Sequence, residues 1–283
     1  MLAYRSRAKI NIHLHIQHKR LDGFHNIESI MAELQLSDIL FFEISRNDEV
    51  IYEWHVPPMV INSEQNSILR ALQVFKKATL FDGAVRVLVK KYIPLGSGLG
   101  GASSNAVATL QALNEVAGTH LSQNELALLA QQLGSDCNFF IRGGVAWATG
   151  RGDIIKPLSL NQHFSVVLVN PGFHSSTVEA FQLLDAYRTS YGFSSSMQQD
   201  LFTVLQRPPI EWRGTYINDF LPIFLEYGKT VYRSMLHYLS SADFSGLSGS
   251  GSTCFGIFSN STHANRCASS LKEKWPLVLI DKI

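Results

Sequence analysis

The spacing of hydrophobic and polar residues along the chain predicts strands and helices in a mixed order. Residues 10–16 alternate between Ile or Leu and polar side chains, which is the pattern of a half-buried strand. Residues 164–169, FSVVLV, are almost entirely apolar, as expected of a buried strand. Extended segments are predicted at residues 10–16, 38–56, 84–93, 138–149, 164–169 and 277–281.

Between these segments, apolar residues recur at intervals of three and four, which is the pattern of amphipathic helices. One helix begins with a capping box, Ser122-x-x-Glu125, and ends at Gly134. Helices are predicted at residues 66–79, 103–117, 122–133, 177–187, 197–206, 218–240 and 262–274. The order lacks regular βαβ alternation, which indicates an α+β fold with a domain boundary near residues 155–165.

The composition of the 283-residue chain is that of a folded protein of about two domains. Hydrophobic residues make up 46% and charged residues 17%, which excludes a disordered chain. The net charge of +1 gives no reason to expect a nucleic acid or a membrane as a partner. No run of 18 apolar residues occurs, and the basic N-terminus leads into a strand, so neither a membrane span nor a signal peptide is expected.

The three cysteines, Cys137, Cys254 and Cys267, are irregularly spaced. Their spacing fits neither a disulfide framework nor a zinc site. It suits a reducing compartment, so we expect a cytoplasmic protein.

Residues 94–110, PLGSGLGGASSNAVATL, join a predicted strand to a predicted helix through a glycine-rich turn. Free amides at the start of a helix and the helix dipole can bind a phosphate there without any Lys. The stretch is neither G-x-x-x-x-G-K-[ST] nor a G-x-G-x-x-G with an acidic residue ~20 positions later. The alternative is a plain Gly/Ser turn with Ser103 as the N-cap of the helix. The pattern alone leaves both interpretations open.

Polar residues occupy one face of the first strand, where Lys9, Asn11 and His13 should point the same way. They could hold a substrate hydroxyl or phosphate, or they could form an ordinary solvated face. Asp136 lies in a run of small and apolar residues, where an unpaired buried charge would be costly. It could be the N-cap of a helix, or a general base kept ionised by a Lys such as Lys9.

The segment Asp22-Gly23-Phe24-His25 contains a typical turn dipeptide. Its simplest interpretation is turn chemistry alone. The functional alternative puts Phe24 and His25 in a ligand pocket, as an aromatic ring and a hydrogen-bonding group.

Taken together, these segments resemble the GHMP kinases, the superfamily of galactokinase, homoserine kinase and mevalonate kinase. The similarity extends over essentially the whole chain, and the glycine-rich loop is its most specific part. The segments that carry it are Ala8-Lys9-Ile10-Asn11, Asp22-Gly23-Phe24-His25, Pro94-Leu95-Gly96-Ser97-Gly98-Leu99-Gly100-Gly101-Ala102-Ser103-Ser104-Asn105, Gly134-Ser135-Asp136 and Gly249-Ser250-Gly251.

The resemblance implies a two-domain GHMP kinase fold, with residues 1–158 and 159–283 as domains and the active site in the cleft between them. It implies ATP and Mg²⁺ as cofactors and a small-molecule substrate. The A-K-I-N start and the D-G-F-H turn are most similar to the members that act on a cytidine diphosphate sugar alcohol. These members phosphorylate the 2-hydroxyl of its methylerythritol unit in the non-mevalonate isoprenoid pathway. We expect a cytoplasmic monomer or weak dimer that binds no nucleic acid and no membrane.

The same resemblance assigns roles to individual residues. Asp136 would be the catalytic base and Lys9 its partner, and either Ser103 or Ser104 could add a Mg²⁺ ligand. The residues expected to bind ATP are Pro94, Gly96, Ser97, Gly98, Leu99, Gly100, Gly101, Ala102, Ser103 and Ser104 around the phosphates, with Asn66 and Lys91 near the base and sugar. The residues expected to contact the substrate are Asn11, Phe24, His25, Thr177, Phe181, Gly249 and Gly251.

One position departs from the family pattern. Relatives usually have Val or Ile and then Pro after the catalytic Asp, whereas this chain has Cys137 and Asn138. Pro would fix the backbone beside the Asp, and Asn cannot do so. Asp136 itself is intact, so we expect activity, and we expect Cys137 to be a small buried hydrophobic residue rather than a nucleophile.

Two other functions remain open at this stage. One is a GHMP kinase for a different small alcohol, against which the D-G-F-H turn speaks. The other is a non-catalytic nucleotide or metabolite sensor on the same fold. A sensor would need neither Lys9 nor Asp136, so the presence of both argues against it.

Overall fold

The computed structural model describes residues 1–192 and 200–283. The strands are β1 (Leu2–Lys19), β2 (His25–Ser45), β3 (Glu49–Trp54), β4 (Ala84–Lys91), β5 (Val145–Thr149), β6 (Ile154–Leu158), β7 (Ser165–Asn170), β8 (Phe244–Leu247), β9 (Cys254–Phe258) and β10 (Leu277–Lys282). The α-helices are α1 (Ser67–Thr79), α2 (Gly101–Val116), α3 (Gln123–Ala130), α4 (Cys137–Arg142), α5 (Thr177–Tyr191), α6 (Leu201–Leu205), α7 (Phe220–Glu226), α8 (Val231–Tyr238) and α9 (Ser261–Lys272). Two short 3-10 helices are η1 (Ser63–Gln65) and η2 (Pro209–Trp212).

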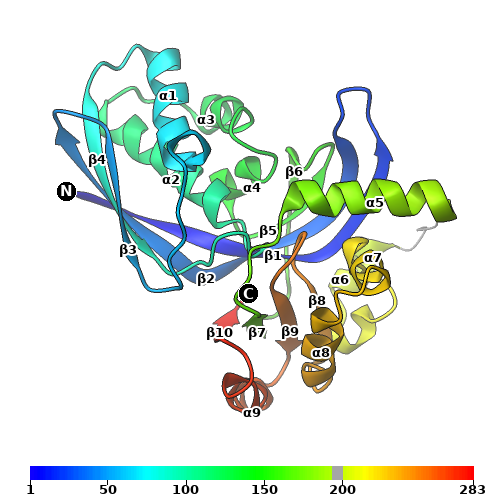
Figure 1. Ribbon diagram of the computed structural model, residues 1–283. Coiled ribbons are helices and arrows are strands. Elements are labelled where there is room, and N and C mark those ends of the chain that lie inside the picture. The colour runs from blue at the N-terminus through cyan, green and yellow to red at the C-terminus, as the bar shows by residue number, and fades with distance from the viewer. Residues whose placement is uncertain (193–199) are drawn as a thin grey trace.

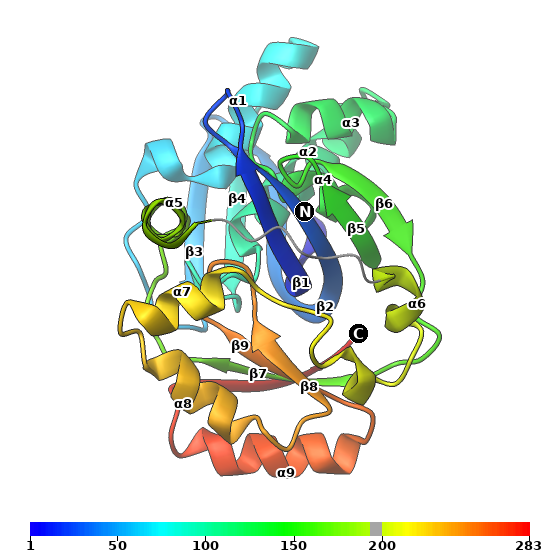
Figure 2. The ribbon, with the colours of Figure 1, turned by 90° about the vertical axis from the view of Figure 1, so that its right-hand side faces the viewer.

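The strands form two sheets, which confirms the predicted α+β class. In the first sheet the order is β3-β4-β2-β5-β6, and β1 pairs with β2. In the second sheet the order is β10-β7-β9-β8. Helices α1 to α4 lie on one side of the first sheet, and α8 and α9 lie beyond the second (Figure 1, Figure 2). The fold therefore stacks helices, sheet, sheet and helices as layers.

Strand β7 explains why the two sheets pack together. Val166 and Leu168 belong to a core cluster that also contains Ile10 and Ile12 of the first sheet. The alternate residues of β7 pack in a different cluster, which includes residues of α8 and α9. Because both faces of β7 are covered, its sequence is apolar without alternation, as predicted.

Strand β1 corrects one expectation about its faces. The pairing of β1 with β2 has a register shift between Asn11 and His13. An extra residue in one strand reverses which side chains face which way. Lys9, Asn11 and then Leu14 line one cavity, whereas His13 lies against Trp147 and Tyr216. The prediction that His13 shares a face with Lys9 and Asn11 is therefore wrong.

Other differences concern the boundaries of elements. Residues 138–142 were expected to be β-rich, but they form most of α4, and only β5 is extended. The run Phe139, Phe140 and Ile141 is buried, and a short apolar run does not distinguish a strand from a buried helix. The glycines after it do end the helix, as Gly143 and Gly144 both have positive φ.

The long helix predicted at 218–240 is in fact two helices, α7 and α8. Gly228 lies between them with a φ of +76°, a conformation that no helix continues through. The helix predicted at 197–206 corresponds to α6, and the first residues of that prediction lie outside the described residues. The remaining predicted helices are present, with ends that differ by a few residues.

The last strand of the first sheet ends at Leu158, and the first strand of the second begins at Ser165. We therefore propose to keep residues 1–158 and 159–283 as the two domains. Within the described parts of the chain, no helix is both long and apolar enough to span a membrane. The three cysteines are free and buried.

Candidate active site

A cavity of about 590 Å³ lies where the two domains meet. Its walls come from β1, the β1–β2 hairpin, the glycine-rich loop, the start of α4, helix α5 and the turn after β8. Of the residues expected at the site, the cavity is lined by Lys9, Asn11, Phe24, His25, Pro94, Gly96, Ser97, Gly98, Gly100, Gly101, Ala102, Ser103, Asp136, Thr177, Phe181 and Gly249. Segments far apart in the sequence thus meet at one place.

The glycine-rich loop turns sharply before helix α2. Gly96, Gly98 and Gly100 all have positive φ, which residues with a side chain rarely adopt. The N-cap of α2 is Gly100, and no side chain caps this helix end, so the alternative with Ser103 as N-cap is wrong. The first amides of a 16-residue helix therefore face the cavity without a capping side chain. Such an end binds anions, helped by the helix dipole.

The two serines at the start of α2 point in different directions. Ser103 lines the cavity, whereas Ser104 is buried and its Oγ accepts a hydrogen bond from Ser6 Oγ at 2.7 Å. Of these two serines, Ser103 is therefore the one that can contact a phosphate or a metal ion in the cavity. Residues 1–192 and 200–283 contain no cluster of three or more His, Cys, Asp or Glu that could hold a metal by itself.

Lys9 and Asp136 form an ion pair inside the cavity. Lys9 Nζ lies 3.2 Å from Asp136 Oδ2, and its side chain is 4% exposed while that of Asp136 is 30% exposed. Asp136 is at the N-cap position of α4 but makes no capping hydrogen bond with its side chain. Its carboxylate therefore points to Lys9 and the cavity, where it can accept a proton.

Asn11 fixes the ammonium group of Lys9 from the same strand. Lys9 Nζ donates a hydrogen bond to Asn11 Oδ1 at 2.5 Å, and Asn11 Nδ2 donates to Ser29 Oγ at 2.8 Å. A Cβ built on Gly249 would lie 3.4 Å from Asn11 Oδ1. The turn after β8 thus closes over the pair of Lys9 and Asn11.

The two glycine-rich segments contact each other directly. Ser248 Oγ donates a hydrogen bond to Gly98 O at 2.9 Å, and Thr253 N donates to Ser97 O at 3.0 Å. A Cβ on Gly98 would lie 2.1 Å from Ser248 O, so only glycine permits this approach. The contact joins the glycine-rich loop of the first domain to the second domain.

At the opposite end, a His, a Phe and a carboxylate form a second cluster. The ring of His25 stacks on Phe181 with centroids 4.9 Å apart, and His25 Nε2 lies 2.8 Å from Asp185 Oδ1. Lys19 Nζ lies 2.6 Å from Asp185 Oδ2. Burial raises the pKa of Asp185, but hydrogen bonds from Lys19 and His25 outweigh it and hold this pKa below its ordinary value. The carboxylate therefore stays ionised and orients both groups.

Phe24 and Thr177 also line the cavity. The Phe24 ring is 49% exposed, and the guanidinium carbon of Arg151 lies 4.8 Å from its centroid. Thr177 Oγ1 lies 3.0 Å from Ser250 Oγ, which links α5 to the turn after β8. An aromatic ring, an imidazole and cationic groups thus surround one end of the cavity, which suits a base joined to a diphosphate.

Five of the expected site residues do not line the cavity: Asn66, Lys91, Leu99, Ser104 and Gly251. Asn66 caps α1, with its side chain accepting from Ile68 N at 3.0 Å. Lys91 is buried and paired with Asp38, its Nζ 2.5 Å from Asp38 Oδ2. Burial lowers the pKa of Lys91, and the charge of Asp38 opposes this. The Lys91 ammonium lies behind the start of α2, 3.3 Å from where a Gly101 Cβ would be.

Several residues of the cavity were not predicted from the sequence. Asp185 is four positions after Phe181 and therefore lies on the same face of α5, a spacing from which it could have been inferred. No local pattern distinguishes Lys19, Arg151 or Ser175, because only the fold brings them to the cavity. Phe220, which packs edge to face on Phe181 at 5.1 Å, also had no signal in the sequence.

The unusual pair after Asp136 is accommodated at the start of α4. Asn138 Nδ2 donates a hydrogen bond to Asp153 O at 2.9 Å, which ties α4 to the turn between β5 and β6. This bond restrains the start of α4 at the position where the family resemblance implies a Pro. Burial raises the pKa of Cys137 to about 12, a hydrogen bond with Ser103 opposes this, and the charge of Asp136 adds to it. The thiol is therefore protonated and unreactive at neutral pH.

Both halves of the chain match sequence models of known protein domains. The sequence models described as "GHMP kinases N terminal domain" and "GHMP kinases C terminal" match residues 66–144 and 222–277. The chain is 34% identical over 280 residues to a 4-diphosphocytidyl-2-C-methyl-D-erythritol kinase of Thermodesulfovibrio yellowstonii, covering 97% of this chain and 96% of the relative. A kinase of the same name from Bacteroides thetaiotaomicron is 33% identical over 261 residues, covering 89% and 90% of the two chains.

Solved structures extend the likeness to three dimensions. The crystal structure of a 4-(cytidine 5'-diphospho)-2C-methyl-D-erythritol kinase superposes with a TM-score of 0.80 at 26% identity, covering 99% of this chain and 98% of the other. The homoserine kinase of Cytophaga hutchinsonii shares the fold, with a TM-score of 0.67 at 14% identity, covering 99% and 92%. The chain therefore belongs to the 4-diphosphocytidyl-2-C-methyl-D-erythritol kinase family of the GHMP kinases.

Proposed function

We propose that this chain transfers the γ-phosphate of ATP to the 2-hydroxyl of 4-diphosphocytidyl-2-C-methyl-D-erythritol. This reaction belongs to the non-mevalonate route to isoprenoid precursors. Family membership supports the reaction class, ATP as donor and a small-molecule acceptor. The observation that carries the proposal is the Lys9–Asp136 pair, 3.2 Å apart beside the uncapped start of α2.

Asp136 is the general base in this proposal. The oxygen of the 2-hydroxyl attacks the γ-phosphorus, its proton passes to the Asp136 carboxylate, and ADP leaves with the bridging oxygen. Lys9 pairs with Asp136 and orients it, and its charge lies close to the attacking oxygen. Asn11 holds Lys9 in place through its Oδ1.

Phosphates of ATP bind in this proposal to the amides at the start of α2 and in the loop before it. The glycine-rich loop replaces the Lys of other phosphate-binding loops with backbone groups and a helix dipole. Ser103 is the proposed protein ligand for Mg²⁺, because its hydroxyl lines the cavity and Ser104 is buried against Ser6. Mg²⁺ would supply charge neutralisation at the phosphates, and it often retains several waters as ligands.

The other end of the cavity binds the cytidine diphosphate portion in this proposal. Phe24 and Phe181 offer rings for stacking, and His25 offers a hydrogen bond to the base. Asn66 and Lys91 do not line the cavity. We propose separately that they lie near the base and sugar of ATP. Gly249 and Thr177 border the acceptor between the two ends.

The test is turnover of the purified protein with ATP, Mg²⁺ and each of three acceptors. We expect ADP release with the cytidine diphosphate substrate and little with homoserine or mevalonate. Turnover of either of the other alcohols instead would support a kinase of different specificity. Binding of ATP and substrate without turnover would support a sensor, the function that the Lys9–Asp136 pair argues against.

The role of His25 is tested separately. His25→Ala should raise KM for the cytidine substrate about tenfold, the effect of losing one good hydrogen bond, with kcat nearly unchanged. His18→Ala, at an exposed position on the neighbouring strand β1, is the matched control and should leave KM unchanged. An unaltered KM in the His25 variant would remove this residue from base recognition.

The remaining parts of the proposal concern the setting of the enzyme. We propose a cytoplasmic monomer or weak dimer that acts without nucleic acid. Three free, buried cysteines suit a reducing compartment. The near-neutral net charge of +1 suits a protein whose partners are small molecules.

A further inference from the structure

Residues 217–219 form a short bridge between the two domains. Leu14 N donates a hydrogen bond to Ile217 O at 2.8 Å, and Asp219 N donates to Leu14 O at 3.0 Å. Leu14 and Asn218 are thus paired as in a parallel sheet. Leu14 lies three positions after Asn11 on the same strand and lines the cavity. The bridge is therefore attached to β1, the strand that carries Lys9 and Asn11.

Asn218 connects this bridge to the turn after β8. Its side chain is buried, and Nδ2 donates to Leu247 O at 2.7 Å and to Gly249 O at 2.8 Å. Its Oδ1 accepts from Phe220 N at 3.0 Å. Both amide protons of Asn218 thus go to carbonyl groups on either side of Ser248, and no other residue type of this size can make all three bonds.

The turn held by Asn218 is the wall above the catalytic residues. Ser248 Oγ donates to Gly98 O, and Asn11 N donates to Ser248 Oγ at 3.4 Å. Gly249 approaches both Asn11 Oδ1 and Gly98 O. A shift of this turn would alter the space between Asn11 and the phosphate-binding loop, where the acceptor hydroxyl and the γ-phosphate must meet.

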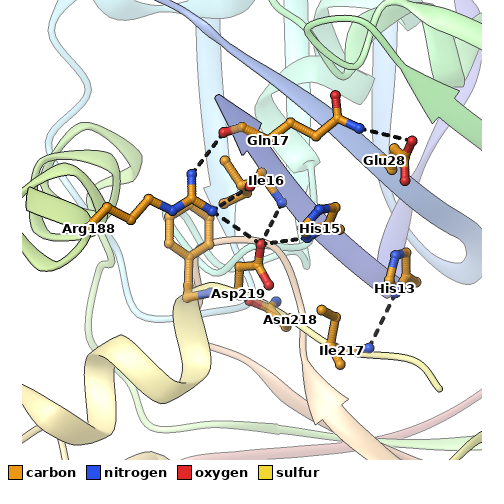
Figure 3. Close-up of polar contacts among 10 residues, drawn as sticks. His13, His15, Ile16, Gln17, Glu28, Arg188, Ile217, Asn218 and Asp219 are labelled. Atoms are coloured by element: carbon orange, nitrogen blue, oxygen red, sulfur yellow. Dashed lines mark hydrogen bonds and ion pairs between the residues drawn. The ribbon is translucent and has the colours of Figure 1, made fainter. Parts of the chain in front are cut away.

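Asp219 connects the same bridge to helix α5 (Figure 3). Its Oδ2 accepts from Ile16 N at 2.7 Å and from His15 Nδ1 at 3.0 Å, and lies 3.5 Å from Arg188 Nη2. Arg188 in turn donates to the carbonyl groups of Gln17 and Ile16 (Figure 3). Arg188 lies on α5 beyond Phe181 and Asp185, so this network fixes the helix that supplies the wall around His25.

Phe220 also supports helix α5. Its ring packs edge to face on Phe181, with centroids 5.1 Å apart, and it also lines the cavity. Three consecutive residues thus support the two ends of the cavity. Asn218 supports the turn at the reacting end, while Asp219 and Phe220 support α5 at the base-binding end.

We propose that Asn218 and Asp219 are positioning residues with separable effects, Asn218 on the chemical step and Asp219 on binding of the acceptor substrate. Neither residue lines the cavity, so Asn218 acts through the turn after β8 and Asp219 acts through helix α5. This inference rests on the proposed kinase reaction and assigns two further residues to it.

Asn218→Asp tests the first half. The substitution keeps the size of the side chain but puts a carboxylate against two carbonyl oxygens, which displaces the turn. We expect kcat to fall about 10- to 100-fold, since small misplacements of reacting groups have effects of this order, with KM for the acceptor within about twofold. Asn114→Ala is the matched control: Asn114 also bonds backbone groups, donating to Leu121 O and accepting from Leu121 N, but away from the cavity.

A double-mutant cycle separates positioning from general loss of stability. If Asn218 acts through the turn on Asn11, then Asn218→Ala should have little further effect on kcat in an Asn11→Ala background. Fully multiplicative losses would contradict the inference. So would a kcat loss in Asn114→Ala as large as that in Asn218→Asp.

Asp219→Asn tests the second half. It removes the charge that joins His15 and Arg188, and we expect KM for the acceptor to rise about tenfold with kcat within about twofold. Asp281→Asn is the matched control, because Asp281 also accepts from backbone amides of the other domain, Gln35 N at 2.9 Å and Leu36 N at 2.6 Å, without lining the cavity. Equal changes in kcat and KM for the Asn218 and Asp219 variants would overturn the division of roles.

Hydrogen exchange provides a readout that does not depend on the substrate. We expect faster amide exchange in residues 246–253 for Asn218→Asp and in α5 for Asp219→Asn, and no change in either for the two controls. If the wild-type protein fails to phosphorylate the cytidine substrate, the proposed function fails while this exchange pattern still decides the positioning roles. Unchanged exchange in both segments would overturn them.

Discussion

Single side chains set the chemistry of the cavity. Asp136 makes no capping bond and points to Lys9, and Lys9 is oriented by Asn11. The neighbouring Cys137 shows the opposite behaviour, since burial keeps its thiol protonated. The proposed general base and an inert thiol thus follow each other in the chain, and their surroundings account for the difference.

Asp136→Asn removes the proposed base with little change in size. We expect kcat to fall by about 10²–10⁴-fold, the usual contribution of a general base, with KM for ATP nearly unchanged. Asp48→Asn, at a carboxylate paired with Lys76 far from the cavity, is the control for removing a negative charge. Steady-state kinetics with ATP and the cytidine substrate provide the measurement, and full turnover in the Asp136 variant would refute its role.

Ser103 and Ser104 offer a comparison between adjacent hydroxyl groups. Ser103→Ala should raise KM for Mg²⁺·ATP several-fold, on the order of one lost hydrogen bond or metal contact. Ser104→Ala should leave this KM unchanged and lower the unfolding free energy by about 1 kcal/mol, because its hydroxyl is buried against Ser6. The reverse pattern in kinetics and urea unfolding would show that the cavity-facing Ser has been misassigned.

At the scale of elements, the site depends on how two glycine-rich segments meet. The loop before α2 and the turn after β8 approach so closely that a side chain at Gly98 would overlap Ser248 O. Each segment is a turn with positive φ values, and each belongs to a different domain. The contact therefore explains the glycines by the packing of one turn on the other as well as by local conformation.

Gly98→Ala and Gly118→Ala separate these two causes. Both residues have positive φ, +77° and +60°, but a Cβ on Gly118 meets no atom within 4 Å. We expect Gly118→Ala to cost about 1 kcal/mol of stability with unchanged kinetics. Gly98→Ala should lower kcat/KM by at least about 100-fold at temperatures where it stays folded, because the two turns are pushed apart. Similar kinetics in the two variants would contradict this explanation.

At the scale of the whole molecule, the domains are joined by an apolar core and by polar residues of β1. His13 belongs to this junction: its Nδ1 accepts from Ile217 N at 3.3 Å, and its ring lies between Trp147 and Tyr216. Burial lowers the pKa of His13 to about 4, the charge of His15 adds to this, and that of Asp219 opposes it. The domain junction therefore requires a neutral His13.

The stability of the protein should accordingly fall in mild acid. Because the pKa of His13 is about 4 when folded and ~6.5 when unfolded, the unfolded chain binds more protons between these values. The unfolding free energy contributed by His13 then falls as pH falls through this window, by at most about 1.4 kcal/mol per pH unit. Urea unfolding at several pH values in this range should give an unfolding free energy that depends less steeply on pH for His13→Gln than for the wild type. An equal pH dependence in the two proteins would contradict the prediction.

His15 should act in the opposite direction within the same network. Its hydrogen bond with Asp219 raises its pKa, although burial opposes this. Its contribution to stability is therefore present below its unfolded pKa of ~6.5 and is lost as pH rises through the raised folded value. Comparing the pH dependence of the unfolding free energy in a His13 variant and in a His15 variant with that of the wild type separates the two histidines. Their pH windows lie on either side of ~6.5.

The sequence by itself determined the fold class, the order of most elements, the family and most of the residues that were expected to line the candidate site and do line the cavity. This information lies in local patterns, which reflect the conformation of the nearby backbone. Examples are the alternation of β1, the glycines before α2 and the small residues around Asp136. The wrong predictions arose because these patterns carry no information about tertiary contacts. The short apolar run in α4 does not reveal its conformation, and a bulge in β1 leaves no mark on the alternation before it.

Only the tertiary structure decided which side chains meet. The faces of β1 after Asn11, the different directions of Ser103 and Ser104, and the burial of Lys91 against Asp38 all depend on neighbours distant in sequence. The same is true of Asp185 beside His25 and of Asn218 beneath the turn after β8. Hydrogen bonds and ion pairs act over a few ångströms, and the fold alone brings residues 204 positions apart to within that distance, as it does for His15 and Asp219 at 3.0 Å.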